Sequence, residues 1–178
     1  MGTRSKLADS LRPYNVSVTT KGLLLRELEW ITGNVSRLLA LVKPDDLDFR
    51  PNEKVRSLRE LGHHLAQIPA VDLAIMRGLK QEEIHAEEDR LTREAEERAL
   101  PAGWVGVLGG GAKDLGRFME TLSMHDFEAG SGSAFYGRTQ TYAQWLLETI
   151  THLYHHRAQF FGYLKQLGYD VASRNLYD

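Results

Sequence analysis

The chain has no cysteine among its 178 residues. This absence excludes disulfide bonds, thiolate metal ligands and a cysteine nucleophile, and it agrees with a reducing compartment. No segment approaches the roughly 18 consecutive apolar residues of a membrane-spanning helix. Residues 1–18 also lack the apolar centre of a signal peptide. We therefore expect a cytoplasmic protein that has no membrane partner.

An excess of charge of one sign is also missing. The 22 Lys and Arg residues nearly balance the 24 Asp and Glu residues, and the formal net charge is −2. This balance gives no general attraction to nucleic acid, and no basic helix alternates with aromatic residues. At this length, 42% hydrophobic residues are enough for one packed core. We predict a single globular domain that does not bind nucleic acid.

Apolar residues recur at helical spacing in several long segments. The predicted helices cover about residues 19–42, 57–79, 104–124 and 140–167. Ser57, followed three residues later by Glu60, predicts a capping box at the start of the second helix. Gly168 is typical of the residue that follows a helix end. The pattern predicts an all-α fold, a four-helix bundle with a long crossover.

The remaining segments suggest how the chain is divided. We expect an N-terminal tail over residues 1–18, the bundle over 19–168 and a C-terminal tail over 169–178. Residues 80–100 are dense in charge, and they are predicted to form an additional charged helix or a mobile linker. Residues 125–139 are rich in Gly and Ser and are predicted to form a loop.

The clearest chemical signal is the pair His152 and His156 in the last predicted helix. Residues four apart lie one turn apart on the same face of a helix, so both imidazoles can reach one metal ion. Helical projection places this pair on the inner face and His155 on the polar side. The same projection of the second helix selects His64 as inward and His63 as polar. We predict that His64, His152 and His156 form a metal site.

Two alternatives remain open from the sequence. A histidine on an apolar helix face is often a hydrogen-bonded core residue instead of a ligand. A different helical phase would turn His63 or His155 toward the metal. Imidazoles suit zinc, nickel, copper, iron or cobalt, and three protein ligands leave positions for water or substrate. Such an ion would lower the pKa of a bound water or stabilise a thiolate.

Further residues are candidates for the surroundings of this site. Gln159, Tyr163 and Trp145 share the histidine face, where they would orient a ligand or simply pack at the edge of the core. Asp72 projects onto the apolar side of the second helix, and Arg157 projects onto the apolar side of the last one. Because an unpaired buried charge is costly, we predict an ion pair between Asp72 and Arg157.

With these residues in place, residues 20–168 resemble the DinB/YfiT-like superfamily. The resemblance rests on Ser57-Leu-Arg-Glu60-Leu-Gly-His63-His64-Leu-Ala and on His152-Leu-Tyr-His155-His156-Arg157-Ala-Gln159. It implies a metal-binding four-helix bundle in which His64, His152 and His156 hold a divalent ion, with zinc or nickel favoured over manganese or iron. It also implies a homodimer. Ala158 stands where many relatives carry glycine, which leaves the ligands unaffected.

The resemblance also suggests a reaction. Members of the superfamily include S-transferases that use bacillithiol or mycothiol. Our leading expectation is a metal-dependent transferase that activates a low-molecular-weight thiol for attack on a small-molecule electrophile. The absence of a protein thiol agrees with an external one. A metal-dependent hydrolase is the close alternative, and a non-catalytic, stress-related metal-binding bundle is the other. An open cavity beside the metal site would favour an enzyme, and a filled bundle centre would favour a binding protein.

Overall fold

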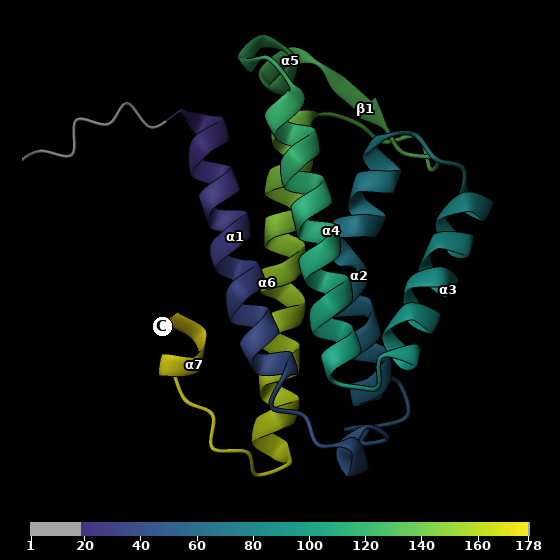
Figure 1. Ribbon diagram of the computed structural model, residues 1–178, viewed down its shortest axis with the longest axis vertical. Coiled ribbons are helices and arrows are strands. Elements are labelled where there is room, and N and C mark those ends of the chain that lie inside the picture. Colours follow the sequence, from purple (N-terminus) through teal and green to yellow (C-terminus); the bar gives the residue numbers. More distant parts are fainter. Residues whose placement is uncertain (1–18, 178) are drawn as a thin grey trace, which may run out of the picture.

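The computed structural model describes residues 19–177, so the tail predicted for residues 1–18 lies outside the described part. The elements follow in the order α1 Thr20–Leu39, the 3-10 turn η1 Pro44–Asp46, α2 Leu58–Met76, α3 Gln81–Glu97, α4 Ala102–Thr121, α5 Met124–Ala129, β1 Ser131–Ser133, β2 Thr139–Thr141, α6 Tyr142–Gln166 and α7 Arg174–Tyr177. The long helices α1, α2, α4 and α6 pack side by side along one axis (Figure 1). The predicted four-helix bundle is confirmed.

The helix ends follow the local signals in the sequence. The Ser57 hydroxyl accepts a hydrogen bond from the Glu60 N–H at 3.2 Å, and the Glu60 carboxylate accepts one from the Ser57 N–H at 2.7 Å. This capping box satisfies two amides at the start of α2 that have no partner within the helix. Gly168, with φ of +81°, follows the end of α6 in the left-handed conformation that glycine adopts without strain.

The core lies between the four long helices, and small residues bring α2 and α4 close together. A side chain at Gly62 would lie 2.5 Å from the Trp104 ring, and one at Gly111 would lie 2.9 Å from the Ala70 backbone nitrogen. The space that these glycines leave lets the fully buried Trp104 ring pack directly on the α2 backbone. These contacts fix the position of α2 relative to α4, and therefore the positions of the side chains that α2 carries.

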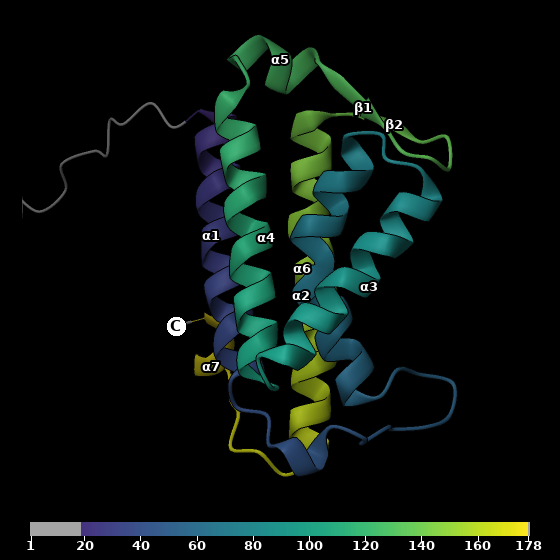
Figure 2. The same cartoon turned by 45° about the vertical axis from the view of Figure 1, so that its right-hand side comes forward.

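The charge-dense segment 80–100 forms the ordered helix α3, which settles the choice between helix and mobile linker. This helix lies against α2 and α4 (Figure 2) and buries Ile84, Leu91 and Ala95. It covers the polar face of α2, on which the projection placed His63. The Gln67 side-chain amide, for example, donates to the Glu88 carbonyl oxygen at 2.9 Å and to the Thr92 hydroxyl at 2.8 Å. Polar residues on that face are therefore matched by a polar helix.

The segment 125–139, predicted to be a loop, is partly regular. It contains most of α5 and the strand β1, which pairs antiparallel with β2 in a short hairpin, Ser131 opposite Thr141. The buried Trp145 donates its indole N–H to the Gly132 carbonyl oxygen at 3.0 Å and so attaches the hairpin to α6. A side chain at Gly132 would come within 2.0 Å of the Met76 carbonyl oxygen, so the hairpin also rests on the end of α2. A two-stranded hairpin is only marginally stable by itself, and these tertiary contacts stabilise it.

The predicted ion pair between Asp72 and Arg157 is wrong. Arg157 is buried on the side of α6 that faces α1 and α7, where it donates to the Asn34 side-chain oxygen at 3.2 Å and to the Leu176 carbonyl oxygen at 3.0 Å. Its guanidinium also lies over the Tyr154 ring, 4.6 Å from the centroid. Uncharged acceptors and an aromatic face thus replace the expected carboxylate, and they fasten the C-terminal segment to the bundle.

None of the helices in the described part of the chain combines the length and apolar character needed to cross a membrane.

Candidate metal centre

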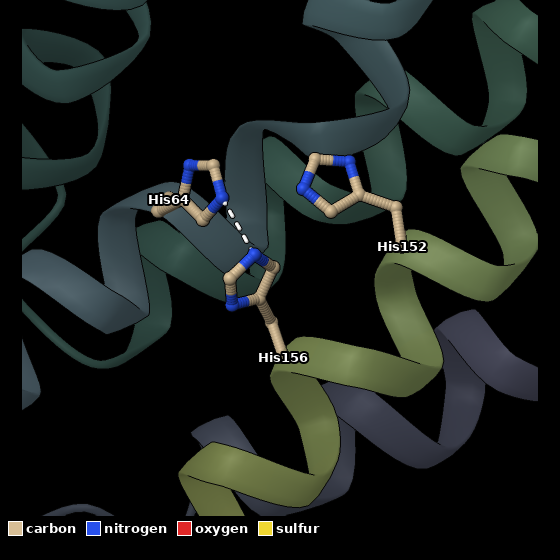
Figure 3. A group of neighbouring side chains, drawn as sticks. All are labelled: His64, His152 and His156. Carbon is tan, nitrogen blue, oxygen red and sulfur yellow. Dashed lines mark hydrogen bonds between the residues drawn. The ribbon is translucent and has the colours of Figure 1, made fainter.

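The neighbouring helices α2 and α6 bring three histidines together. His64 comes from α2, and His152 and His156 come from consecutive turns of α6, with the three rings turned toward one another (Figure 3). One ring nitrogen of each lies within 4.8 Å of the others. Among residues 19–177, this is the one group of three or more histidine and acidic side chains with such a geometry.

The distances between the rings suit a shared ion. The Nε2 atoms of His64 and His156 are 3.0 Å apart, and the ring centroid of His64 lies 5.2 Å from that of His152. Two nitrogens on a tetrahedral zinc ion, with bonds of about 2.1 Å, lie ~3.4 Å apart. Small side-chain rotations would therefore bring the nitrogens to ligand positions. The donor set, three imidazoles without a thiolate, fits zinc, nickel or another borderline transition metal.

The surroundings keep two of these imidazoles neutral, which is the form that binds metal. Burial, with smaller contributions from the nearby His156 and Arg56, lowers the pKa of His64 to about 3. Burial also lowers the pKa of His156 to about 4, against the opposing effect of its hydrogen bond to Gln159. Neutral histidine offers a lone pair, whereas imidazolium offers none. At neutral pH both residues are therefore ready to act as ligands.

Two polar side chains contact the outer nitrogens of the α6 histidines. The Gln159 side-chain oxygen lies 2.8 Å from Nδ1 of His156, and an Asp72 carboxylate oxygen lies 3.5 Å from Nδ1 of His152. Because both partners are acceptors, each favours the tautomer that carries its proton on Nδ1 and leaves the lone pair on Nε2. Such contacts orient metal-binding histidines and increase their basicity. Asp72 thus contacts His152 of the histidine group instead of pairing with Arg157.

The histidines that the sequence left as alternative ligands lie outside the group. His155 is exposed, with Nε2 3.1 Å from the Gln159 side-chain nitrogen. His63 turns the other way, toward α3 and α4, where Nε2 lies 2.9 Å from the Glu96 carboxylate and the ring packs edge-on against Trp104. The projection placed His63 on a polar face correctly, but α3 and α4 cover that face, so the side chain is only 12% exposed.

Of the other residues expected near the site, Gln159 and Asp72 contact it, whereas Trp145 and Arg157 do not. Trp145 holds the hairpin and Arg157 holds the C-terminal segment. Helical projection could not tell the residues that contact the histidines from those that do not. The contacts of a residue depend on which neighbouring element packs against its part of the helix face. Tyr163 lies farther along α6, where its hydroxyl donates to the Arg56 carbonyl oxygen at 3.0 Å.

A cavity of about 910 Å³ opens beside the histidines, between the loop before α2 and the C-terminal half of α6. Its lining residues are Arg50, Glu53, Lys54, Val55, Arg56, Glu60, Leu61, Ala158, Gln159, Gly162, Tyr163 and Gln166. The three histidines do not line this cavity, but Gln159 belongs both to its wall and to the surroundings of His156, so one side chain connects the cavity to the histidine group. The positively charged loop residues were missed from the sequence, although Arg50-Pro-Asn-Glu-Lys-Val-Arg56 combines three cations in seven residues.

A much smaller cavity, about 20 Å³, touches the histidines from the other side. It lies between α2, α3 and α6, and its wall includes His64, His152, Asp72 and Glu88. A space of this size holds about one water molecule. Of these two cavities, the wide one that Gln159 lines has room for a substrate.

Comparison with solved structures gives the same architecture. A crystal structure of a candidate DinB family member from Exiguobacterium sibiricum is 30% identical to this chain, with a TM-score of 0.66, and the match covers 86% of this chain and 95% of that one. YfiT from Bacillus subtilis, described as a probable metal-dependent hydrolase with an unusual four-helix bundle topology, matches with 16% identity and a TM-score of 0.64. That match covers 84% of this chain and 89% of YfiT.

A DinB-like protein of Bacillus subtilis, YjoA, gives a TM-score of 0.59 at 17% identity, over 83% of this chain and 92% of the other. At such identities YfiT and YjoA establish the fold alone. No curated protein shows significant similarity to the chain. The profile of the DinB family, in contrast, matches residues 15–177, which include all three histidines and the whole bundle. On this match, and on the bundle that carries it, the chain belongs to the DinB family.

Proposed function

We propose that this protein is a metal-dependent enzyme that activates a low-molecular-weight thiol for transfer to a small electrophilic substrate. The observation that carries the proposal is the convergence of His64, His152 and His156 beside an open cavity. Three protein ligands leave coordination positions open, which is typical of catalytic and not of structural sites.

The residues around the site have separate tasks in this proposal. The three histidines hold a divalent ion, and Gln159 and Asp72 keep the α6 imidazoles in the tautomer that presents Nε2. The bound ion supplies Lewis-acid chemistry that lowers the pKa of a thiol or of water. The cavity is within the usual size range of small-molecule sites, roughly 300–1,000 Å³. A small thiol and its acceptor therefore have room in the cavity that Gln159 connects to the ligands.

The composition supports an external thiol. The chain has no cysteine, so it cannot supply a sulfur nucleophile of its own. The cavity beside the histidines also argues for an enzyme over a non-catalytic bundle, in which the space next to the metal would be filled by side chains. Zinc or nickel as the native metal, a homodimer and a cytoplasmic location remain predictions from the sequence.

Hydrolysis is the second candidate, and the description of YfiT as a probable metal-dependent hydrolase favours it. The same three ligands would then activate water instead of a thiol. The two reactions differ in what they require. Thiol transfer needs an added thiol and gives a thioether product, whereas hydrolysis proceeds without any thiol.

The first experiment measures the metal content of the untagged protein by elemental analysis, with His156→Ala as the test variant. His125→Ala is the matched control, because His125 is exposed and lies outside the histidine group. We expect about one divalent ion per chain in the wild type and the control, and a loss of that ion in His156→Ala. Absence of metal from the wild type after reconstitution with zinc, nickel and manganese would contradict the proposal.

A second experiment tells the two reactions apart. The metal-loaded protein is incubated with 1-chloro-2,4-dinitrobenzene and each of several thiols, and separately with p-nitrophenyl acetate without a thiol. Thiol transfer predicts turnover that requires both a thiol and the ion and is lost in His156→Ala. Metal-dependent ester hydrolysis without a thiol, together with no thiol conjugation, would favour the hydrolase instead.

A further inference from the structure

We propose that the cavity beside the histidines recognises a small organic anion, a molecule with a carboxylate or phosphate group, and that Arg56 with Lys54 binds this group. The inference rests on the proposed function, since it names the substrate class of that site. Its experimental test, however, does not require turnover.

The loop that carries these cations is held in place by its own contacts. Arg50 forms an ion pair with Glu60 at 2.8 Å and donates to the Val55 carbonyl oxygen. The Tyr163 hydroxyl donates to the Arg56 carbonyl oxygen at 3.0 Å, which ties the end of the loop to α6. The Arg56 backbone is therefore fixed at the wall of the cavity, while its side chain is exposed. Fixing the backbone reduces the entropy lost when a ligand binds.

The charges of the cavity wall are unevenly paired. Glu60 is neutralised by Arg50, and its carboxylate also accepts the Ser57 N–H in the capping box. Within residues 19–177, neither Arg56 nor Lys54 has a carboxylate within 4.0 Å. A guanidinium presents two parallel N–H donors that match a carboxylate or a phosphate group. Arg56 is thus the cation in this wall that is both available and shaped for such a group.

The same arginine is linked to the histidine group through one neighbour in the cavity wall. Gln159 connects the two regions, because its side chain lines the cavity and contacts His156. A ligand anchored by its anionic group at Arg56 would therefore place its remaining part toward the three imidazoles. The loop thus forms the recognition end of the cavity, and Gln159 marks the end that is connected to the histidines.

The overall charge favours an anion over a neutral or cationic ligand. The wall contains three cationic side chains and two acidic ones, and one of the acidic pair is already bound to Arg50. A divalent ion on the three uncharged imidazoles would add further positive charge at the other end. Both ends of the cavity then attract the same sign of charge, which raises the affinity for small anions and the rate at which they enter.

The first test measures anion binding by nuclear magnetic resonance on the ¹⁵N-labelled full-length protein, zinc-loaded and again after metal removal. Succinate and inorganic phosphate are the two probes, and the amide of Gly162 in the cavity wall is the reporter. Arg56→Gln is the test variant. Arg93→Gln is the matched control, because Arg93 is an exposed arginine of α3 outside the cavity.

For the wild type and the control we expect a saturable shift of the Gly162 amide with at least one probe. In Arg56→Gln the affinity should fall by about tenfold or more, as expected for loss of a charge-assisted hydrogen bond. The probe that binds more tightly tells a carboxylate from a phosphate preference. Absence of a saturable shift with either probe in the wild type, or equal affinity in Arg56→Gln, would overturn the inference.

A second test separates failure of this inference from failure of the proposed function. Cobalt-loaded protein is titrated with 3-mercaptopropionate and with 2-mercaptoethanol, which differ in a carboxylate but share the thiol, and the sulfur-to-cobalt absorption band is followed. The inference predicts tighter binding of the carboxylate thiol in the wild type and loss of that preference in Arg56→Gln. Equal affinities with a normal absorption band would refute the anion site and leave the metal site intact. Failure to bind cobalt would refute the proposed function, while the succinate and phosphate titrations would still decide the anion site.

Discussion

Replacing Asp72 by Asn tests whether the contact to His152 supports metal binding. The Asp72 carboxylate is only 13% exposed and its oxygen lies 3.5 Å from Nδ1 of His152. Asn has nearly the same size and keeps a carbonyl oxygen as an acceptor. The substitution therefore removes the negative charge while leaving the packing of α2 unchanged.

The expected size of the effect follows from this geometry. Loss of a side chain that orients a metal-binding histidine lowers metal affinity by about 10- to 100-fold. The separation of 3.5 Å is at the long limit of a hydrogen bond, so the contact acts mainly through charge. We therefore expect the lower end of that range, about a tenfold loss of affinity, which corresponds to ~1.4 kcal/mol.

The assay is a competition titration of zinc against a chromogenic chelator for the wild type and for Asp72→Asn. Asp114→Asn is the control, because Asp114 is an acidic residue on α4 with a side-chain exposure of 67%, and it pairs with the neighbouring Arg117 at 3.6 Å. Urea unfolding of the metal-free variants checks that both fold normally. An Asp72→Asn variant with unchanged zinc affinity would refute the reasoning that the carboxylate acts on His152.

Three further predictions concern pH and stability. The lowered pKa values of His64 and His156 mean that, as the pH falls below about 6.5, the unfolded chain binds protons that the folded metal-free protein does not. The free energy of unfolding should therefore decrease between pH 6.5 and about 4, by roughly 1 kcal/mol per histidine at pH 5 after allowance for solvent screening. Urea unfolding at pH 7.5 and 5.0 measures this decrease, which should be smaller when both histidines are replaced by Gln. Gly132→Ala should displace the hairpin, since the added methyl group would come within 2.0 Å of the Met76 carbonyl oxygen, and faster proteolysis within residues 131–141 would show this. Ser57→Ala removes the hydroxyl acceptor of the capping box, and thermal unfolding should show a loss of about 1 kcal/mol without a change in helix content.

The local sequence was sufficient for the four long helices and for the histidines that come together. Apolar spacing gave the four long helices to within a few residues, because burying one face of a helix requires that periodicity. The spacing of His152 and His156 places both imidazoles on one face of any helix, whatever packs against it. Projection of the second helix correctly separated His64 from His63. Side-chain direction along a helix is a local property, and the sequence therefore determined it.

Only the tertiary structure decided which elements pack against each helix face. The sequence could not show that α3 would cover His63, or that α1 and α7 would surround Arg157 with Asn34 and backbone oxygens. It also could not show that the loop carrying Arg56 returns to α6 beside the histidines. Burial, lowered pKa values and cavities arise from atoms that are distant in the chain and adjacent in space. They depend on how the helices pack, which the periodicity of a single helix does not specify.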